Sequence, residues 1–226
     1  MIDARRWVDE LKGKLVDTFG ERLLFVGFQG SYKRGEATEE SDIDVVAILD
    51  RLDLPELSTY RALVAEMPHA EMACGFIAGR DELQSWPRFE IFQMGRETEA
   101  LHGSLAGLLP PVTEADVRLS VQIAASGLYH LLCHTYLYGK GEERTGALLG
   151  AYKSLFFVLQ LVHYLATGIY CGTKAELLEA LDGAEVELLR TSIEVKRAGL
   201  QGDPDEHFRK LIGWASATMR ATAPLT

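Results

Sequence analysis

Two aspartates, Asp42 and Asp44, interrupt an apolar run that ends at Leu49. Side chains of a β-strand alternate between its two faces, so both carboxylates project from one face while Ile43 and Val45 project from the other. Two like charges this close repel each other unless a cation lies between them, and a hard divalent cation with oxygen ligands is the usual solution. The pair therefore predicts a strand that carries a Mg²⁺ site. The alternative is that Asp42 caps a turn after Ser41 and that Asp44 points to solvent from an edge strand.

The segment before these aspartates favours the metal site. Leu23 to Phe28 reads as a short apolar strand that runs into Gly30 and Ser31, where a missing Cβ and a small hydroxyl leave room for a phosphate. Exposed backbone N–H groups in such a turn bind anions. A phosphate-binding turn followed by a metal-binding strand suits a nucleoside triphosphate, whose oxygens contact N–H groups on one side and Mg²⁺ on the other.

These elements, together with Arg34-Gly35 and the S-D-I-D run at 41–44, resemble the signature of the polymerase β-type nucleotidyltransferases. Within that superfamily the chain is similar to the small bacterial antibiotic nucleotidyltransferases and the minimal nucleotidyltransferase domains. The signature covers Gly30 to Asp44, and its elements occur in the expected order. The resemblance implies a Mg²⁺-dependent enzyme that moves a nucleoside monophosphate from an NTP, expected to be ATP, to a hydroxyl of a small acceptor and releases pyrophosphate.

The resemblance also implies roles for individual residues. Gly30 and Ser31 would hold the triphosphate, with Arg34 as a further phosphate contact, and Asp42 and Asp44 would bind the metal ions and take part in catalysis. The acceptor is expected in a cleft between the sheet and the helical half. An aminoglycoside-like cation would suit an acidic cleft.

Nucleotidyl transfer with two metal ions needs a third carboxylate on a neighbouring strand. Three glutamates compete for this role, namely Glu71, Glu90 and Glu97. Glu90 has the best local pattern, between Phe89 and Ile91, and is expected to be the third catalytic and metal-binding carboxylate. The identity of the general base is left open, because a carboxylate beside divalent ions has its pKa held down.

Lys153 interrupts an apolar run in the second half of the chain. Lysines of the helical domain contact the triphosphate in related transferases, and the resemblance implies the same for Lys153. The alternative is a lysine whose stem packs on the helices while its ammonium group reaches water.

Composition limits the class of partner and the compartment. The 226 residues carry a formal net charge of −10 and are 47% hydrophobic, which is enough for one or two cores. A basic run is missing, so a nucleic-acid partner is not expected. The sequence shows neither a signal peptide nor an evident membrane span, so we expect a cytoplasmic protein. A homodimer is compatible with the sequence.

Periodicity divides the chain into an α+β half and an all-α half. Residues 1–109 are expected to form a nucleotidyltransferase domain, a sheet with flanking helices, and residues 112–226 a helical bundle. Besides the two signature strands, strands are predicted at 70–79 and at 88–95, and the segment 99–105 resembles the strand that often follows in this superfamily. Thr173 and Glu176 form a capping box that predicts the start of a helix.

An alternative hypothesis is that the protein has the nucleotidyltransferase fold but no catalytic activity. The protein would then be a non-catalytic or antitoxin-like nucleotidyltransferase-fold module that acts through a protein partner. Two neighbouring like charges on one strand face favour activity, since a purely structural domain has no need of them.

Overall fold

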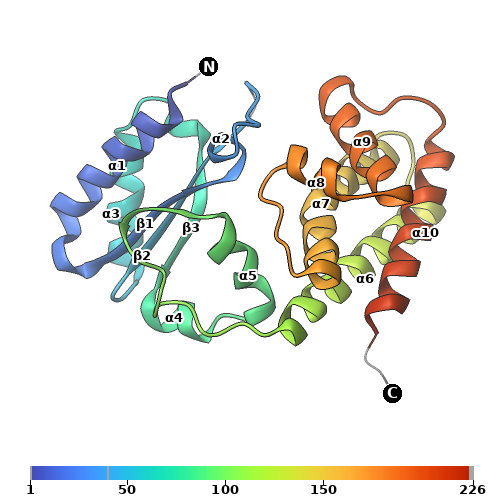
Figure 1. The fold of residues 1–226 in the computed structure, drawn as a ribbon. Coiled ribbons are helices and arrows are strands. Elements are labelled where there is room, and N and C mark those ends of the chain that lie inside the picture. The colour runs from blue at the N-terminus through green and yellow to red at the C-terminus, as the bar shows by residue number, and fades with distance from the viewer. Residues whose placement is uncertain (1, 40, 224–226) are drawn as a thin grey trace. The chain divides into compact units, whose positions relative to one another are not determined.

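The computed structural model describes residues 2–39 and 41–223. They divide between Val112 and Thr113 into two compact units. The first unit combines a sheet with helices and the second is helical, so the α+β class expected from the sequence is confirmed (Figure 1).

A four-stranded mixed sheet forms the centre of the first unit. Its strands are β1 (Leu23–Gln29), β2 (Ile43–Leu49), β3 (Ala73–Gly79) and β4 (Glu99–Gly103), in the spatial order β3-β2-β1-β4. Strand β1 runs antiparallel to β2 and β4, whereas β2 and β3 are parallel. Because β1 and β2 run in opposite directions, the end of β1 lies beside the start of β2, and Gln29 is paired with Asp44. The two halves of the sequence signature therefore meet at one end of the sheet.

Helices cover both faces of this sheet (Figure 1). Helices α1 (Ala4–Phe19) and α3 (Leu54–Ala65) pack on one face, where Ile43 and Val45 are buried. On the other face Val46 and Ile48 pack with Leu83 of α4 (Arg80–Ser85) and with α5 (Arg88–Glu97). Three short elements, η1 (Gly20–Arg22), α2 (Gly30–Lys33) and η2 (Ala70–Met72), join the longer ones.

The strand expected at 88–95 is wrong, because this segment lies in helix α5. The alternation of Phe89 and Ile91 suggested a strand, but Pro87 directly before it supplies the helix N-cap. Proline fixes φ and has no N–H to contribute to a sheet, so it is better placed at a helix start. The Glu90 N–H then donates to the Pro87 carbonyl at 2.9 Å, and the Ile91 side chain is buried.

The second unit contains α6 (Glu114–Tyr138), α7 (Glu142–Thr167), α8 (Lys174–Ala180), α9 (Gly183–Ala198) and α10 (Pro204–Thr222). Helix α6 packs against α7 and α10, and α7 also packs against α9. The capping box is confirmed, because the Thr173 hydroxyl accepts from the Glu176 N–H at 3.2 Å at the start of α8. By length and composition α7 could cross a membrane, but 50% of its apolar window is buried within the protein. An apolar helix of this kind is typical of a core.

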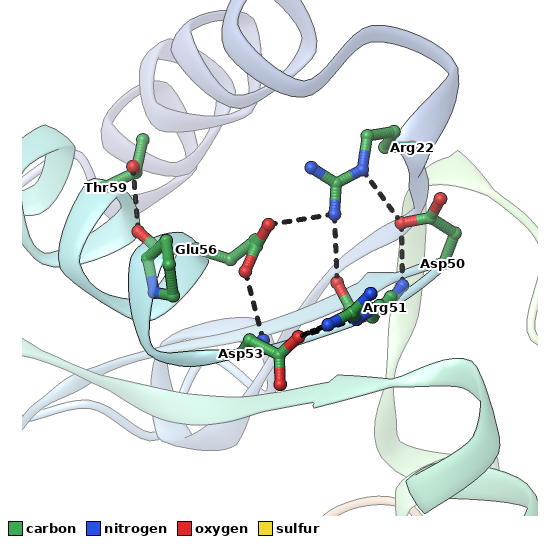
Figure 2. A network of polar contacts seen from close by, with 7 residues as sticks. Arg22, Asp50, Arg51, Asp53, Glu56 and Thr59 are labelled. Carbon is green, nitrogen blue, oxygen red and sulfur yellow. Dashed lines mark hydrogen bonds and ion pairs between the residues drawn. The ribbon is translucent and has the colours of Figure 1, made fainter.

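The end of the sheet remote from the signature is closed by a network of charged side chains (Figure 2). Arg22 donates to Asp50 at 3.1 Å and to Glu56 at 3.0 Å, and thereby joins the start of β1 to the end of β2 and to α3. Hydrogen bonding from its own backbone N–H, and then from Arg22, lowers the pKa of Glu56. These residues line a surface cavity of about 430 Å³. Since its acids and arginines pair with one another, we assign this cavity a structural role.

Candidate active site

The turn after β1 brings Gly30 against the carboxylate of Asp44. Gly30 has φ +79°, a backbone conformation that residues with a Cβ rarely adopt. A Cβ at this position would overlap with Oδ2 of Asp44. Glycine is therefore required twice, once for the backbone angle and once for the space that the carboxylate occupies.

Three backbone hydrogen bonds close this turn. The N–H groups of Arg34 and Gly35 donate to the carbonyls of Gly30 and Tyr32, each at 3.2 Å. The Glu36 N–H donates to the Ser31 carbonyl at 2.8 Å. The segment that the sequence predicted to hold phosphate is thus a compact turn directly beside Asp44.

Asp44 lies near the start of β2, and Asp42 immediately precedes that strand. Ile43 and Val45 are buried on the α1 side of the sheet, so strand alternation places Asp44 on the other side. Asp42 is exposed, whereas Asp44 is partly buried beside Gly30. The structure therefore places Asp42 and Asp44 at the same end of the sheet as Gly30 and Ser31.

The strands beside β2 carry no carboxylate next to Asp44. Its partner on β3 is Cys74, and its partner on β1 is Gln29. The expectation that Glu90 lies on a neighbouring strand is wrong, because Glu90 is in α5 and accepts from Trp86 Nε1 at 2.7 Å. Glu71 lies in η2, where its exposed carboxylate is 3.7 Å from His69 Nδ1.

Glu97, the third glutamate considered from the sequence, is the buried one. It is the last residue of α5, it is 5% exposed, and its carboxylate pairs with Arg34 at 3.2 Å. Thr98 follows and places its hydroxyl 2.8 Å from Oε1 of Gln29. Sequence reasoning missed Gln29, although its position directly before Gly30 could have indicated a contact at the turn.

Lys153 lies on α7 in the second unit and its side chain is exposed. Its position on a helix of the helical half is as the sequence indicated. The role of Lys153 toward a triphosphate stays a prediction.

The donor set at this end of the sheet fits a divalent cation held jointly with a nucleotide. Within residues 2–39 and 41–223 no group of three or more His, Cys, Asp or Glu side chains is arranged to hold a metal ion alone. Mg²⁺, however, is commonly bound by one or two carboxylates together with substrate phosphates and water. Asp42 and Asp44 supply hard oxygen donors, and the missing Cβ of Gly30 leaves room for the Asp44 carboxylate.

Comparison with known proteins agrees with this geometry. Residues 8–90 match the model of the family described as nucleotidyltransferase domain, a range that includes the whole signature. No curated protein matches the chain significantly.

Among solved structures, the fold is similar to that of a spectinomycin adenyltransferase from Enterococcus faecialis, crystallised with ATP and spectinomycin. The two chains share 12% sequence identity with a TM-score of 0.58, and the similarity covers 96% of this chain and 99% of that chain. The family match shows that residues 8–90 form a nucleotidyltransferase domain, and the common fold, with the Gly-Ser turn beside the Asp-x-Asp strand, supports its place in the polymerase β-type superfamily.

Proposed function

We propose that the protein transfers AMP from ATP to a hydroxyl group of a small acceptor in a Mg²⁺-dependent reaction that releases pyrophosphate. The observation that carries the proposal is the contact between Gly30 and Asp44, which sets the turn proposed to bind phosphate directly against the carboxylate proposed to bind metal. Further support comes from the similar adenyltransferase, which was crystallised with ATP and spectinomycin. The proposed setting is the cytoplasm.

Each part of the proposed site has a separate task. Gly30 and Ser31 would bind the triphosphate through the turn, and Asp42 and Asp44 would hold Mg²⁺. When bound, the ion would neutralise charge on the phosphate oxygens and on the leaving pyrophosphate. The protein then contributes mainly alignment, because a phosphoryl centre attacked in line needs positioning more than covalent help from side chains.

Chemistry and the similar structure support one proposed class of acceptor. A hydroxyl-bearing, positively charged small molecule, such as an aminoglycoside or an aminocyclitol, would complement a chain of formal net charge −10. Spectinomycin in the similar structure is a compound of this kind. We therefore expect acceptors of this class to stimulate pyrophosphate release.

One observation favours a second candidate, the non-catalytic or antitoxin-like module that acts through a protein partner. The residue paired with Asp44 on β3 is Cys74, where a catalytic site with a third carboxylate would have an acid. A domain that has lost this acid would keep the fold and could keep nucleotide binding without turnover.

Calorimetric titration of ATP, with and without Mg²⁺, tests the proposal on the wild type and on the Asp42→Asn/Asp44→Asn variant. The matched control is Asp50→Asn/Asp53→Asn, which removes the same two charges beyond the other end of β2. We expect Mg²⁺-dependent binding that the first variant loses and the control keeps. Binding that survives in both variants would place the nucleotide elsewhere.

Turnover separates the two candidates. Pyrophosphate release in the presence of ATP, Mg²⁺ and a panel of aminoglycosides and aminocyclitols is expected for the enzyme. Binding without release from any acceptor would favour the partner-binding module, and failure of every NTP to bind would overturn the enzyme proposal.

A further inference from the structure

We propose that Glu97, acting through Arg34, is a positioning residue that fixes the Gly-Ser turn against Asp44. The inference rests on the proposed function, because it assigns these two residues a task in nucleotidyl transfer. It gives Arg34 a role different from the direct phosphate contact that the sequence suggested.

The Arg34 guanidinium is held by carboxylates on two sides. Its Nη1 lies 3.2 Å from Oε2 of Glu97, and its Nε lies 3.3 Å from Oε2 of Glu36. Only 7% of the Arg34 side chain is exposed. A guanidinium with these partners is directed into the protein, so its contacts position the backbone that carries it.

That backbone is the turn itself. Arg34 donates its own N–H to the Gly30 carbonyl, and Glu36 donates its N–H to the carbonyl of Ser31. The side-chain pair between Arg34 and Glu36 therefore lies on the same residues as the backbone bonds that close the turn. Glu97 attaches this closed turn to the end of α5, 63 residues later in the chain.

A second contact joins α5 to the strand that leads into the turn. The Thr98 hydroxyl lies 2.8 Å from Oε1 of Gln29 and 2.6 Å from the Met94 carbonyl. Gln29 is in turn the β1 partner of Asp44. The end of α5 thus contacts the turn through Glu97 and the paired strand through Thr98, which fixes both halves of the site to one support.

Burial makes this support stiff. Glu97 is 5% exposed, and both members of the Arg34–Glu97 pair have side chains 7% exposed. Water cannot solvate a buried charge that has lost its partner, so breaking the pair costs free energy and the pair stays formed in the folded protein. The reaction rate depends strongly on where the groups that align the reactants lie, since a displacement of about 1 Å can lower a rate by about 100-fold.

The test compares Glu97→Gln, Arg34→Gln and the double variant in steady-state kinetics of pyrophosphate release with ATP, Mg²⁺ and an aminoglycoside or aminocyclitol that the wild type accepts. We expect each single change to lower kcat on the order of 100-fold with little change in the KM for ATP. The losses should be non-additive in the double variant, because the two residues act as a unit. A direct phosphate contact by Arg34 would instead raise the KM for ATP in Arg34→Gln and leave Glu97→Gln near the wild type.

Amide hydrogen exchange gives a readout that does not depend on turnover. In Glu97→Gln we expect faster exchange of the Gly35 and Glu36 amides, whose hydrogen bonds close the turn. The control is Glu56→Gln at the other end of the sheet, which should leave these two amides unchanged. Unchanged exchange at Gly35 and Glu36 in Glu97→Gln would overturn the proposal, whatever the activity of the protein.

The outcomes for the two proposals are distinct. A wild type that neither binds ATP nor releases pyrophosphate contradicts the proposed function, while the exchange experiment still decides whether Glu97 holds the turn. A wild type that turns over, with variants that lose thermal stability but keep wild-type kcat and KM, shows a merely structural pair and overturns the positioning role.

Discussion

An arginine lies among carboxylates at each end of the β1–β2 pair, and the two clusters differ in their exposure to solvent. The Arg34 side chain is 7% exposed and joins the Gly-Ser turn to α5. The Arg22 side chain is 44% exposed and joins the start of β1 to the end of β2 and to α3 (Figure 2). The same chemistry is therefore used once inside the protein and once on its surface.

Because their exposure to solvent differs, the two clusters are expected to contribute differently to the stability of the fold. Exposed ion pairs contribute little, because water solvates both partners nearly as well as they solvate each other. A buried pair that loses one partner leaves a charge in a poor solvent, which is strongly destabilising. Rigid geometry is thus concentrated at the end of the sheet where the nucleotide is proposed to bind.

The largest effect is expected from Gly30→Ala. The new methyl group would displace the Asp44 carboxylate, and pyrophosphate release should fall on the order of 100-fold. The control is Gly20→Ala at the other end of the sheet, where φ is +54° and a Cβ meets nothing within 4 Å. Both variants place a Cβ at a positive φ, which favours glycine, and only Gly30→Ala also brings that Cβ against Asp44. Equal losses in the two variants would contradict it.

The next effect concerns the stability of the fold and comes from the two arginines, measured as the free energy of unfolding in urea. Arg34→Gln leaves Glu97 buried without this partner and should destabilise the protein by about 3 kcal/mol. Arg22→Gln should shift the unfolding midpoint slightly, and the shift should disappear in about 1 M NaCl, where surface charges are screened. An Arg22→Gln effect as large as that of Arg34→Gln, and insensitive to salt, would remove the distinction between the clusters.

The smallest effect is expected in the pH dependence of stability, to which Glu56 contributes. The pKa of Glu56 is lowered in the folded protein by hydrogen bonding from its own backbone N–H and from Arg22. A lowered pKa stabilises the fold above the ordinary pKa of the group, and this stabilisation is lost as the pH falls through the lowered value. Unfolding midpoints followed downward from neutral pH should therefore decline less steeply in Glu56→Gln than in the wild type. Identical slopes would show that this carboxylate adds nothing to acid stability.

Local pattern was sufficient for the parts of the site that lie close together in the sequence. Gly30, Ser31, Asp42 and Asp44 fall within one short segment, and the antiparallel pairing of β1 with β2 brings them together. The capping box at Thr173 needs only four residues and was predicted correctly.

Features that depend on distant parts of the chain could not be predicted from local sequence patterns. Phe89 and Ile91 alternate as they would in a strand, but the segment forms a helix in which Ile91 is buried. The pairing of Cys74 with Asp44 depends on the register of two parallel strands, which no local pattern sets. The pair between Arg34 and Glu97 joins residues 63 positions apart, so neither residue signals the other.

The end of β1 also has a consequence for directed evolution. A Cβ on Gly27 would overlap with the Thr98 methyl group, and a Cβ on Gly30 would overlap with Asp44, whereas one on Gly35 meets nothing within 4 Å. A library that randomises this segment should return glycine at the first two positions for reasons of space. At Gly35, where φ is +71°, asparagine should also survive, because only the backbone angle is selected there. The set of amino acids accepted at each position would thus indicate whether a neighbouring side chain lies against it.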